Sequence, residues 1–148
     1  MGISEAIRKS KLSASAFTRQ LFEEQWPEER VAEFINLQRN ATVASTSGDG
    51  QPHAAVVIAA CAHDEIYFAV HPESVLFRNI TANNRIAMSV CDSAHAVMCQ
   101  GQAIALGSAR DLPDLIDLLA SSSPSGLFTP KGWDGLLFRI DLRRLVAN

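Results

Sequence analysis

Between residues 41 and 142 the apolar side chains recur in short runs that end at turn-forming residues. Residues 41–46 (ATVAST) alternate and are rich in β-branched side chains, whereas residues 52–61 (PHAAVVIAAC) are apolar almost without a break. The Asp49-Gly50 pair between them favours a tight hairpin turn. Continued along the chain, this pattern predicts six strands, at residues 41–46, 52–61, 66–70, 85–91, 97–106 and 136–142.

Other segments repeat their apolar residues at the three-to-four-residue spacing of a helix face. Residues 4–25 carry Phe17, Leu21 and Phe22 at such a spacing, and Trp26-Pro27 ends that segment. Proline suits the first turn of a helix, so a second helix is expected to start at Pro27. The pattern therefore predicts four helices, at residues 4–25, 27–39, 75–83 and 111–121.

Strands that follow one another mostly through hairpins, with few strand–helix–strand units, favour a closed or nearly closed antiparallel barrel with helices packed outside it. The expected fold class is therefore mainly β with peripheral helices. A length of 148 residues suits one domain. We expect a single domain over residues 1–148, of which residues 1–26 form an N-terminal helical extension.

Composition narrows the function classes. The net charge is −3 and the 13 basic residues form no stripe, which argues against nucleic-acid binding. No apolar run approaches the ~18 residues of a membrane span, and residues 1–17 lack the apolar stretch of a secretory signal, so we expect a cytoplasmic protein.

The three cysteines are odd in number and lack a C-x-x-C spacing, so we interpret them as small buried hydrophobic residues.

The common signatures of nucleotide-binding proteins and hydrolases are absent from the sequence. The four histidines show no paired spacing such as H-x₃-H, so we expect no metal site. No nucleophile–base pair stands out either.

Several short pieces of the central sequence occur in a characteristic order. They are ATVAST at residues 41–46, DGQPHAAVV at residues 49–57, IYF at residues 66–68, Ser74 with Asn79-Ile80, NRIAM at residues 84–88 and GQA at residues 101–103. In this order and spacing, about half the chain resembles the pyridoxamine-phosphate-oxidase-like family of FMN-binding split barrels. The resemblance implies a six-stranded antiparallel split barrel that is homodimeric, with a flavin mononucleotide (FMN) in each of two sites between the subunits. In some relatives a deazaflavin or haem takes its place.

The phosphate-binding site of that family lies where a strand meets a helix that starts at a serine, here Ser74. Relatives often follow this serine with Arg-Lys or x-Lys, whereas this chain has Val75 and Leu76. Loss of one charged hydrogen bond weakens binding about 10- to 150-fold. The N-terminus of the helix, and Arg78 one turn after Ser74, are candidates to compensate. The alternative interpretations are a plain helix cap for Ser74 and a solvated surface charge for Arg78.

The resemblance also assigns the flavin ring to the strand at residues 54–58, where backbone groups satisfy the ring edge. Val70 and His71 match positions near the ribityl phosphate, and His95 matches a polar flavin contact. Trp133 and Lys131, in a late loop, are candidates to reach the flavin of the partner subunit. Three of these assignments have a structural alternative: an ordinary barrel strand for residues 54–58, a turn histidine for His95 and a core anchor for Trp133. The candidate cofactor-binding residues are Ala55, Val56, Val57, Val70, His71, Ser74, Val75, Leu76, Arg78, His95, Lys131 and Trp133; catalytic residues remain unassigned.

Two functional hypotheses follow. The first is an FMN-dependent oxidoreductase that acts on a small redox substrate. The second is a non-catalytic protein on the same scaffold that binds or senses a flavin or haem, and its motivation is Leu76 at the usual lysine position. Arg139, Arg143 and Arg144 lack the C-terminal pattern of the vitamin B6 oxidase itself, so we do not expect that substrate.

Overall fold

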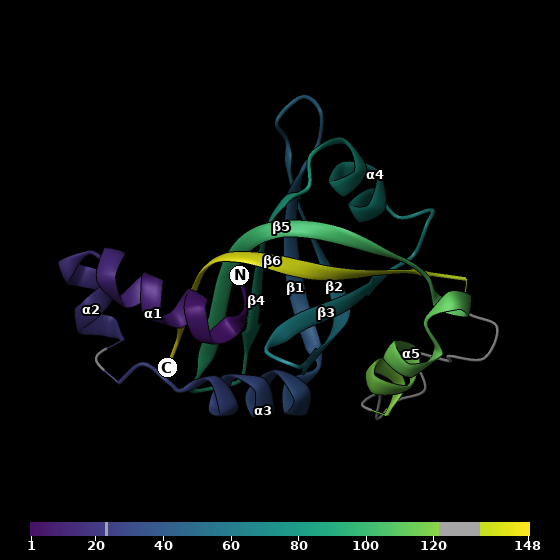
Figure 1. The fold of residues 1–148 in the computed structure, drawn as a ribbon. Coiled ribbons are helices and arrows are strands. Elements are labelled where there is room, and N and C mark those ends of the chain that lie inside the picture. Colours follow the sequence, from purple (N-terminus) through teal and green to yellow (C-terminus); the bar gives the residue numbers. More distant parts are fainter. Residues whose placement is uncertain (23, 122–133) are drawn as a thin grey trace.

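The computed structural model of the chain describes residues 1–22, 24–121 and 134–148. Along the chain, three helices are followed by three strands, a helix, two strands, a 3₁₀ turn, a helix and a last strand (Figure 1). The strands are β1 (Asn40–Thr46), β2 (Pro52–Ala62), β3 (Glu65–Val70), β4 (Arg85–Cys91), β5 (Ala96–Ser108) and β6 (Leu136–Ala147). The helices are α1 (Ile3–Ser13), α2 (Ala16–Leu21), α3 (Glu28–Gln38), α4 (Val75–Ala82) and α5 (Pro113–Ala120), with a 3₁₀ turn at Ala109–Asp111.

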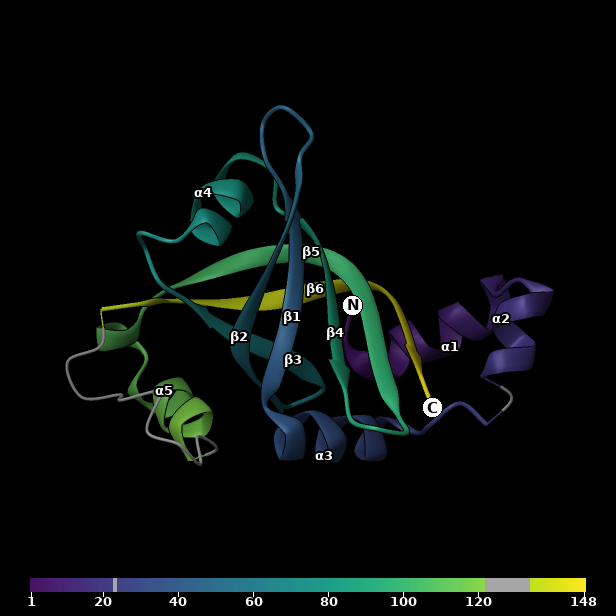
Figure 2. The same cartoon turned by 180° about the vertical axis from the view of Figure 1, so that it is seen from behind.

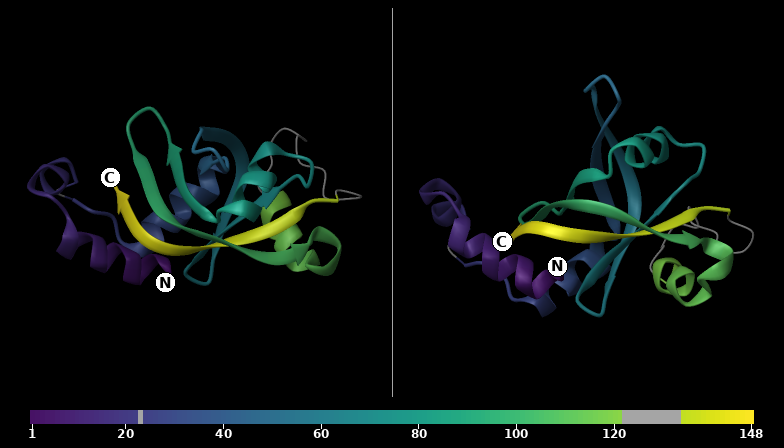
Figure 3. Two further views of the ribbon diagram at one scale, coloured as in Figure 1. Left: turned by 90° about the horizontal axis from the view of Figure 1, so that it is seen from above. Right: turned by 45° about the horizontal axis from the view of Figure 1, so that its top comes forward.

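The six strands form one closed barrel in the order β1-β2-β3-β6-β5-β4, and every neighbouring pair is antiparallel. This confirms the predicted mainly β, six-stranded antiparallel architecture. Figure 2 shows the same barrel from behind, with α3 closing one end and α4 lying near the other, beside the β1–β2 hairpin. The long pair β5–β6 carries α1 and α2 at one end and α5 at the other (Figure 3).

The barrel interior is filled by alternate residues of the strands, as the period of two requires. Along β1, Ala41, Val43 and Ser45 are buried, while the residues between them are exposed. Phe68 and Phe138 stack in the core with ring centroids 5.5 Å apart. A second, smaller cluster forms where Ile116 and Leu119 of α5 pack outside the barrel.

Side-chain hydrogen bonds fasten two helices to the strands. The amide of Asn36 in α3 both donates to and accepts from the backbone of Cys61 in β2, at 3.1 and 2.7 Å. The Ser10 hydroxyl of α1 accepts from the backbone N–H of Leu145 in β6, at 2.9 Å. Both contacts satisfy polar groups that would otherwise be buried unpaired. Each described helix is too short or too polar to cross a bilayer.

The N-terminal segment departs from the predicted single helix at residues 4–25. It forms two helices that break at Ala14 and Ser15, because the Ser15 hydroxyl caps a new helix by accepting from the N–H of Thr18. The buried face belongs to α1, through Ile3, Ala6, Ile7 and Ser10. Phe17 and Leu21 are instead 69% and 52% exposed on α2.

The last strand is five residues longer than the predicted 136–142. The sequence of β6 loses its alternation at Arg143-Arg144, which suggested an end to the strand. The structure resolves this with a β-bulge: Leu142 pairs with Gly101 and Arg144 pairs with Gln100, so Arg143 is an extra residue. After the bulge Leu145 and Ala147 face the core again.

The cysteines are only in part the buried residues that we expected. Cys61 and Cys99 are buried, whereas Cys91 is exposed at the end of β4. Burial raises the pKa of the Cys61 thiol far above its usual range and that of Cys99 to about 12.

We expect a thiol-specific disulfide reagent to modify Cys91 rapidly in the folded protein, because the thiolate is the reacting species and only Cys91 is exposed. Cys61 and Cys99 should react only in denaturant. The amount of thiolate that the reagent releases per protein chain, measured with and without denaturant, checks this expectation. Fast reaction of all three cysteines in the native protein would contradict the buried positions.

Candidate functional site

The first half of β2 carries a free edge. Residues 52–58 pair with β1, while in the described parts of the chain β3 pairs only with residues 59–62 of β2. The strand therefore changes partner near its middle, and its first half presents backbone groups that no neighbouring strand uses. This is the strand to which the sequence assigned the flavin ring.

The two faces of this half-strand differ. Val56 is 70% exposed on the outer face, whereas Ala55 and Val57 pack against the barrel core. The N–H of Ala59 donates to the carbonyl of Arg39, toward β1. Because backbone groups of an antiparallel strand alternate between its two edges, residues 54, 56 and 58 direct their N–H and C=O groups to the free edge. The free edge thus offers donors and acceptors in alternation beside an exposed apolar side chain.

The connection from β3 to α4 is a tight turn held by its own polar groups. The N–H of Ser74 donates to the carbonyl of His71, at 3.0 Å, and the N–H of Glu73 donates to Nδ1 of His71, at 3.1 Å. An accepting Nδ1 is unprotonated, so the proton of the neutral ring sits on Nε2 and is available to an acceptor. His71 is exposed, whereas Val70 is 2% exposed and belongs to the core.

Ser74 caps α4, because its hydroxyl accepts from the N–H of Phe77 at 3.0 Å. The N–H groups of Val75 and Leu76 lie in the first turn, where no helix carbonyl precedes them. Val75 is 40% exposed, but the side chain of Leu76 is 1% exposed and packs in the core. Leu76 can therefore reach a ligand only through its backbone.

One polar link sets the position of α4. The Asn79 amide donates to the hydroxyl of Ser45 in β1 at 3.1 Å, and both side chains are buried. Arg78, the next residue along the chain, is exposed, and its guanidinium has no ion-pair or hydrogen-bond partner among the described residues. This hydrogen bond holds α4 against β1. The guanidinium of Arg78, which has no partner in the described parts of the chain, adds a positive charge near the N-terminus of this helix.

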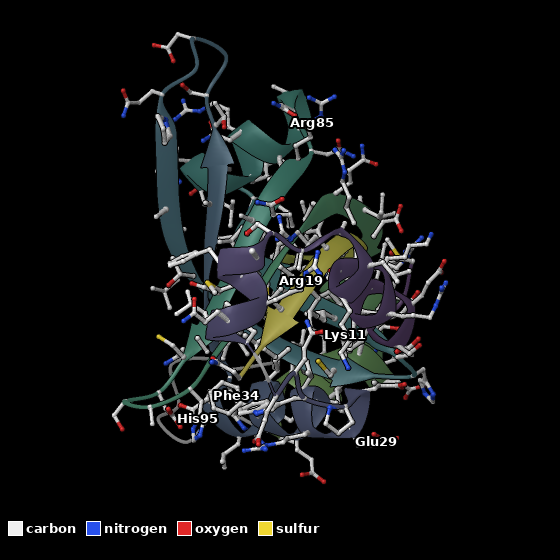
Figure 4. The ribbon with its side chains drawn as sticks, turned by 90° about the vertical axis from the view of Figure 1, so that its left-hand side faces the viewer. Lys11, Arg19, Glu29, Phe34, Arg85 and His95 are labelled. Carbon is white, nitrogen blue, oxygen red and sulfur yellow. The ribbon has the colours of Figure 1, made fainter. Side chains whose placement is uncertain are left out.

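His95 lies away from this group. Its ring meets that of Trp26 at a tilted angle with centroids 5.2 Å apart, and meets that of Phe34 edge-on at 6.3 Å, near α3. Figure 4 shows His95 and Phe34 together at the end of the barrel opposite Arg85. Within one chain the structure therefore does not bring His95 together with Ser74. Lys131 and Trp133 lie outside the described residues.

A concave surface that sequence reasoning missed lies on the outer face of β1, β4, β5 and β6. Arg85, Gln102 and Arg143 line a cavity of about 640 Å³ there, together with the β1–β2 hairpin. These residues are far apart in sequence, and no spacing rule connects them. Only the register of the sheet brings them to one face.

The described residues contain no cluster of three or more His, Cys, Asp or Glu side chains that could hold a metal ion.

The closed antiparallel barrel, the half-paired β2 and the serine-capped helix after β3 define the class as a split-barrel protein. A family model described as pyridoxamine 5'-phosphate oxidase matches residues 27–126, which is more than half of the chain. The chain belongs to the pyridoxamine 5'-phosphate oxidase-like split-barrel family, as the sequence resemblance predicted. No curated protein matches the chain at a significant level.

Solved structures support the same fold. The conserved hypothetical protein Rv2991 from Mycobacterium tuberculosis is similar with 21% identity and a TM-score of 0.68, over 82% of this chain and 84% of that one. An F420 reductase has 18% identity and a TM-score of 0.64, over 76% and 93% of the two chains. The General Stress Protein 26 from Bacillus anthracis has 16% identity and a TM-score of 0.63, over 81% and 92%. At these identities the similarity establishes the fold alone.

Proposed function

We propose that the chain binds FMN along the free edge of β2, with the phosphate at the N-terminus of α4, and acts as a flavin-dependent oxidoreductase. Membership of the family makes a flavin-binding scaffold the starting point. The observation that carries the proposal is the juxtaposition of an unpaired strand edge with an exposed apolar residue, Val56, and a helix tip with free amides. An F420 reductase among the similar structures makes a deazaflavin the alternative cofactor.

The residues of this site suit the two ends of the cofactor. Backbone groups of residues 54, 56 and 58 would bind the polar edge of the ring, and Val56 would contact its apolar plane. The amides of Val75 and Leu76, the positive end of the helix dipole and Arg78 would hold the phosphate. When bound, the flavin supplies reversible uptake of two electrons and a proton, and the protein supplies position and electrostatics.

The proposal includes a homodimer with the cofactor between two copies. A small barrel lacks a deep cleft of its own, so a groove between two barrels provides the enclosure that a ligand of this size needs. His95, at the far end of the barrel, would then reach only a flavin held by the second copy. Light scattering should give about twice the chain mass of 16.1 kDa.

The proposal is tested by an absorbance spectrum and mass spectrometry of the protein as purified, followed by incubation with FMN. We expect flavin absorbance bands and a released mass equal to that of FMN. A released mass equal to that of a deazaflavin would support the proposed site but identify a different cofactor. Protein that stays colourless and unchanged after incubation with FMN and with a deazaflavin would refute the proposal.

A second candidate function is a non-catalytic flavin- or haem-binding protein. It is favoured by Leu76, which occupies a core position where relatives often carry lysine, so the phosphate is held by fewer charges. Flavin that binds but is not reduced by nicotinamide or other donors would favour this candidate. Steady-state turnover with any donor and acceptor pair would exclude it.

A further inference from the structure

One buried polar atom near the β1–β2 hairpin lacks a partner. Nδ1 of His53 is shielded from solvent and makes no hydrogen bond to any described residue. His53 is the second residue of β2 and directly precedes residues 54–58, the part of the strand proposed to hold the flavin ring. A buried nitrogen without a hydrogen bond costs free energy, and such atoms are rare in folded proteins. The nitrogen therefore needs a partner that the backbone does not supply.

The side chain opposite His53 on β1 is that of Ser45. The two residues are Cα partners in the antiparallel register. Directly opposed residues share one face of a sheet, with their Cβ atoms about 4.5–5.5 Å apart. Ser45 is 3% exposed and belongs to the buried side of β1. A serine and a histidine are therefore neighbours inside the part of the barrel that adjoins the hairpin.

Ser45 uses only part of its hydrogen-bonding capacity. Its hydroxyl oxygen accepts from the Asn79 amide of α4 at 3.1 Å. The hydroxyl proton has no acceptor among the described residues, and a hydroxyl rotates about its C–O bond to reach one. When a neutral histidine carries its proton on Nε2, Nδ1 is an acceptor. A free donor and a free acceptor thus lie opposite each other on paired strands.

We infer that the hydroxyl of Ser45 donates to Nδ1 of His53, and that His53 is a positioning residue of the cofactor site. The resulting Asn79–Ser45–His53 link runs from α4 through β1 to β2. The inference rests on the proposed function, because the link joins the two halves of the proposed site: α4 holds the phosphate and β2 holds the ring. α4 contacts both strands and lies beside the hairpin (Figure 2).

The link fixes the helix tip relative to the ring strand, and it does so without chemistry of its own. Ser45 is too deeply buried for a substrate to reach its oxygen, so the pair is not a nucleophile and its base. All three side chains belong to one copy of the chain, so the link does not depend on how two copies meet. Loss of the link should therefore affect the phosphate contacts of the helix tip more than the ring contacts of β2.

The hydrogen bond is tested first, without cofactor, by long-range ¹H–¹⁵N NMR spectra of the histidine rings. These spectra distinguish a protonated ring nitrogen from an unprotonated one, and a hydrogen bond shifts the signal of the latter. In mildly alkaline solution, where imidazole is neutral, we expect His53 to carry its proton on Nε2 and to show a hydrogen-bonded Nδ1. Ser45→Ala should shift that Nδ1 signal and leave the exposed His63 unchanged.

Two NMR results would overturn the inference. A proton on Nδ1 in the unaltered protein would do so, because that nitrogen could then accept no hydrogen bond. An Nδ1 signal that Ser45→Ala leaves unchanged would also do so, because the partner would then be a buried water molecule rather than the hydroxyl. The His53 signals are identified by their absence from the spectrum of His53→Asn.

The positioning role is tested by comparing the affinities of FMN and riboflavin, which lacks the phosphate. His53→Leu removes the acceptor, whereas His53→Asn has nearly the same size and keeps an acceptor oxygen in the place of Nδ1. We expect His53→Leu to lower the preference for FMN over riboflavin about 2- to 10-fold, the effect of one neutral hydrogen bond, with riboflavin affinity unchanged. His53→Asn should keep the preference. Fluorescence titration measures both affinities.

The outcomes separate this inference from the proposed function. If His53→Leu melts at a lower temperature but keeps the full preference for FMN, the histidine is only structural; the inference is then wrong and the proposed function stands. If the unaltered protein binds no FMN, the proposed function fails and the positioning role fails with it. The NMR spectra of the cofactor-free protein still decide whether the hydrogen bond exists.

Discussion

Val56→Glu should weaken FMN binding by at least about tenfold while leaving the fold intact. Val56 is 70% exposed at the centre of the free half of β2, where the proposed ring plane rests. A carboxylate there must give up water to meet an apolar ring, and its charge opposes the negative cofactor. An exposed substitution changes stability by about 0.5 kcal/mol or less, so the melting temperature should move by only about 2 °C. Fluorescence titration of FMN measures the affinity.

Two further variants separate the effect of the site from the effect of charge. Leu37→Glu adds the same charge at a residue of α3 that is 76% exposed, and it should not change FMN affinity. Val56→Thr keeps the shape of the side chain without the charge, and it should retain most of the binding. If Val56→Glu binds FMN as tightly as the unaltered protein, the ring does not lie on this strand.

Gly101→Ala should destabilise the protein by about 3 kcal/mol, at the upper end of the range for overpacking. A Cβ at this position would lie 2.3 Å from the carbonyl oxygen of Asp141 and 2.9 Å from a methyl group of Ile140. The closest atom is backbone, so no side-chain rotation relieves the contact and β5 must separate from β6 at the bulge. For a chain of this size the expected fall in melting temperature is about 6–12 °C.

Circular dichroism during thermal unfolding measures this loss. Gly48→Ala is the matched control, because a Cβ on Gly48 meets no atom within 4 Å. We expect that control to change stability by about 0.5 kcal/mol or less. Equal melting temperatures for the two variants would show that the strands are not as close at the bulge as described.

The sequence predicted the barrel well because alternation reports burial directly. Each of the six strands was anticipated. The reason is clearest for β1 to β5, which carry runs of apolar or alternating residues bounded by turn residues. The Gly-Gln-Ala piece of the family pattern also receives a physical reason, because only glycine fits where the β6 bulge approaches β5.

The failures occurred where local pattern competes with tertiary contacts. Phe17 and Leu21 have helical spacing, but Ser15 starts a new helix and leaves their side chains exposed rather than in the core. The end of β6 was misplaced at residue 142 because a bulge absorbs one of two consecutive arginines. Neither a helix break nor a bulge is visible in hydrophobic periodicity alone.

In the candidate site, only the features formed by residues close together in the sequence were predictable. The turn at His71, the cap at Ser74 and the strand at residues 54–58 follow from sequence order and family resemblance. The burial of Leu76 and the assembly of Arg85 with Arg143 depend on strand register across the barrel, which one sequence does not specify. The positions of Lys131 and Trp133 stay predictions.

The account is tested most directly by titrating ¹⁵N-labelled protein with FMN and following the backbone amide resonances. We expect chemical-shift changes at residues 54–58 on β2 and 74–78 at the tip of α4, with smaller changes in the cavity lined by Arg85 and Gln102. Changes confined to that cavity, or none at all at saturating FMN, would contradict a flavin held between the β2 edge and the helix tip.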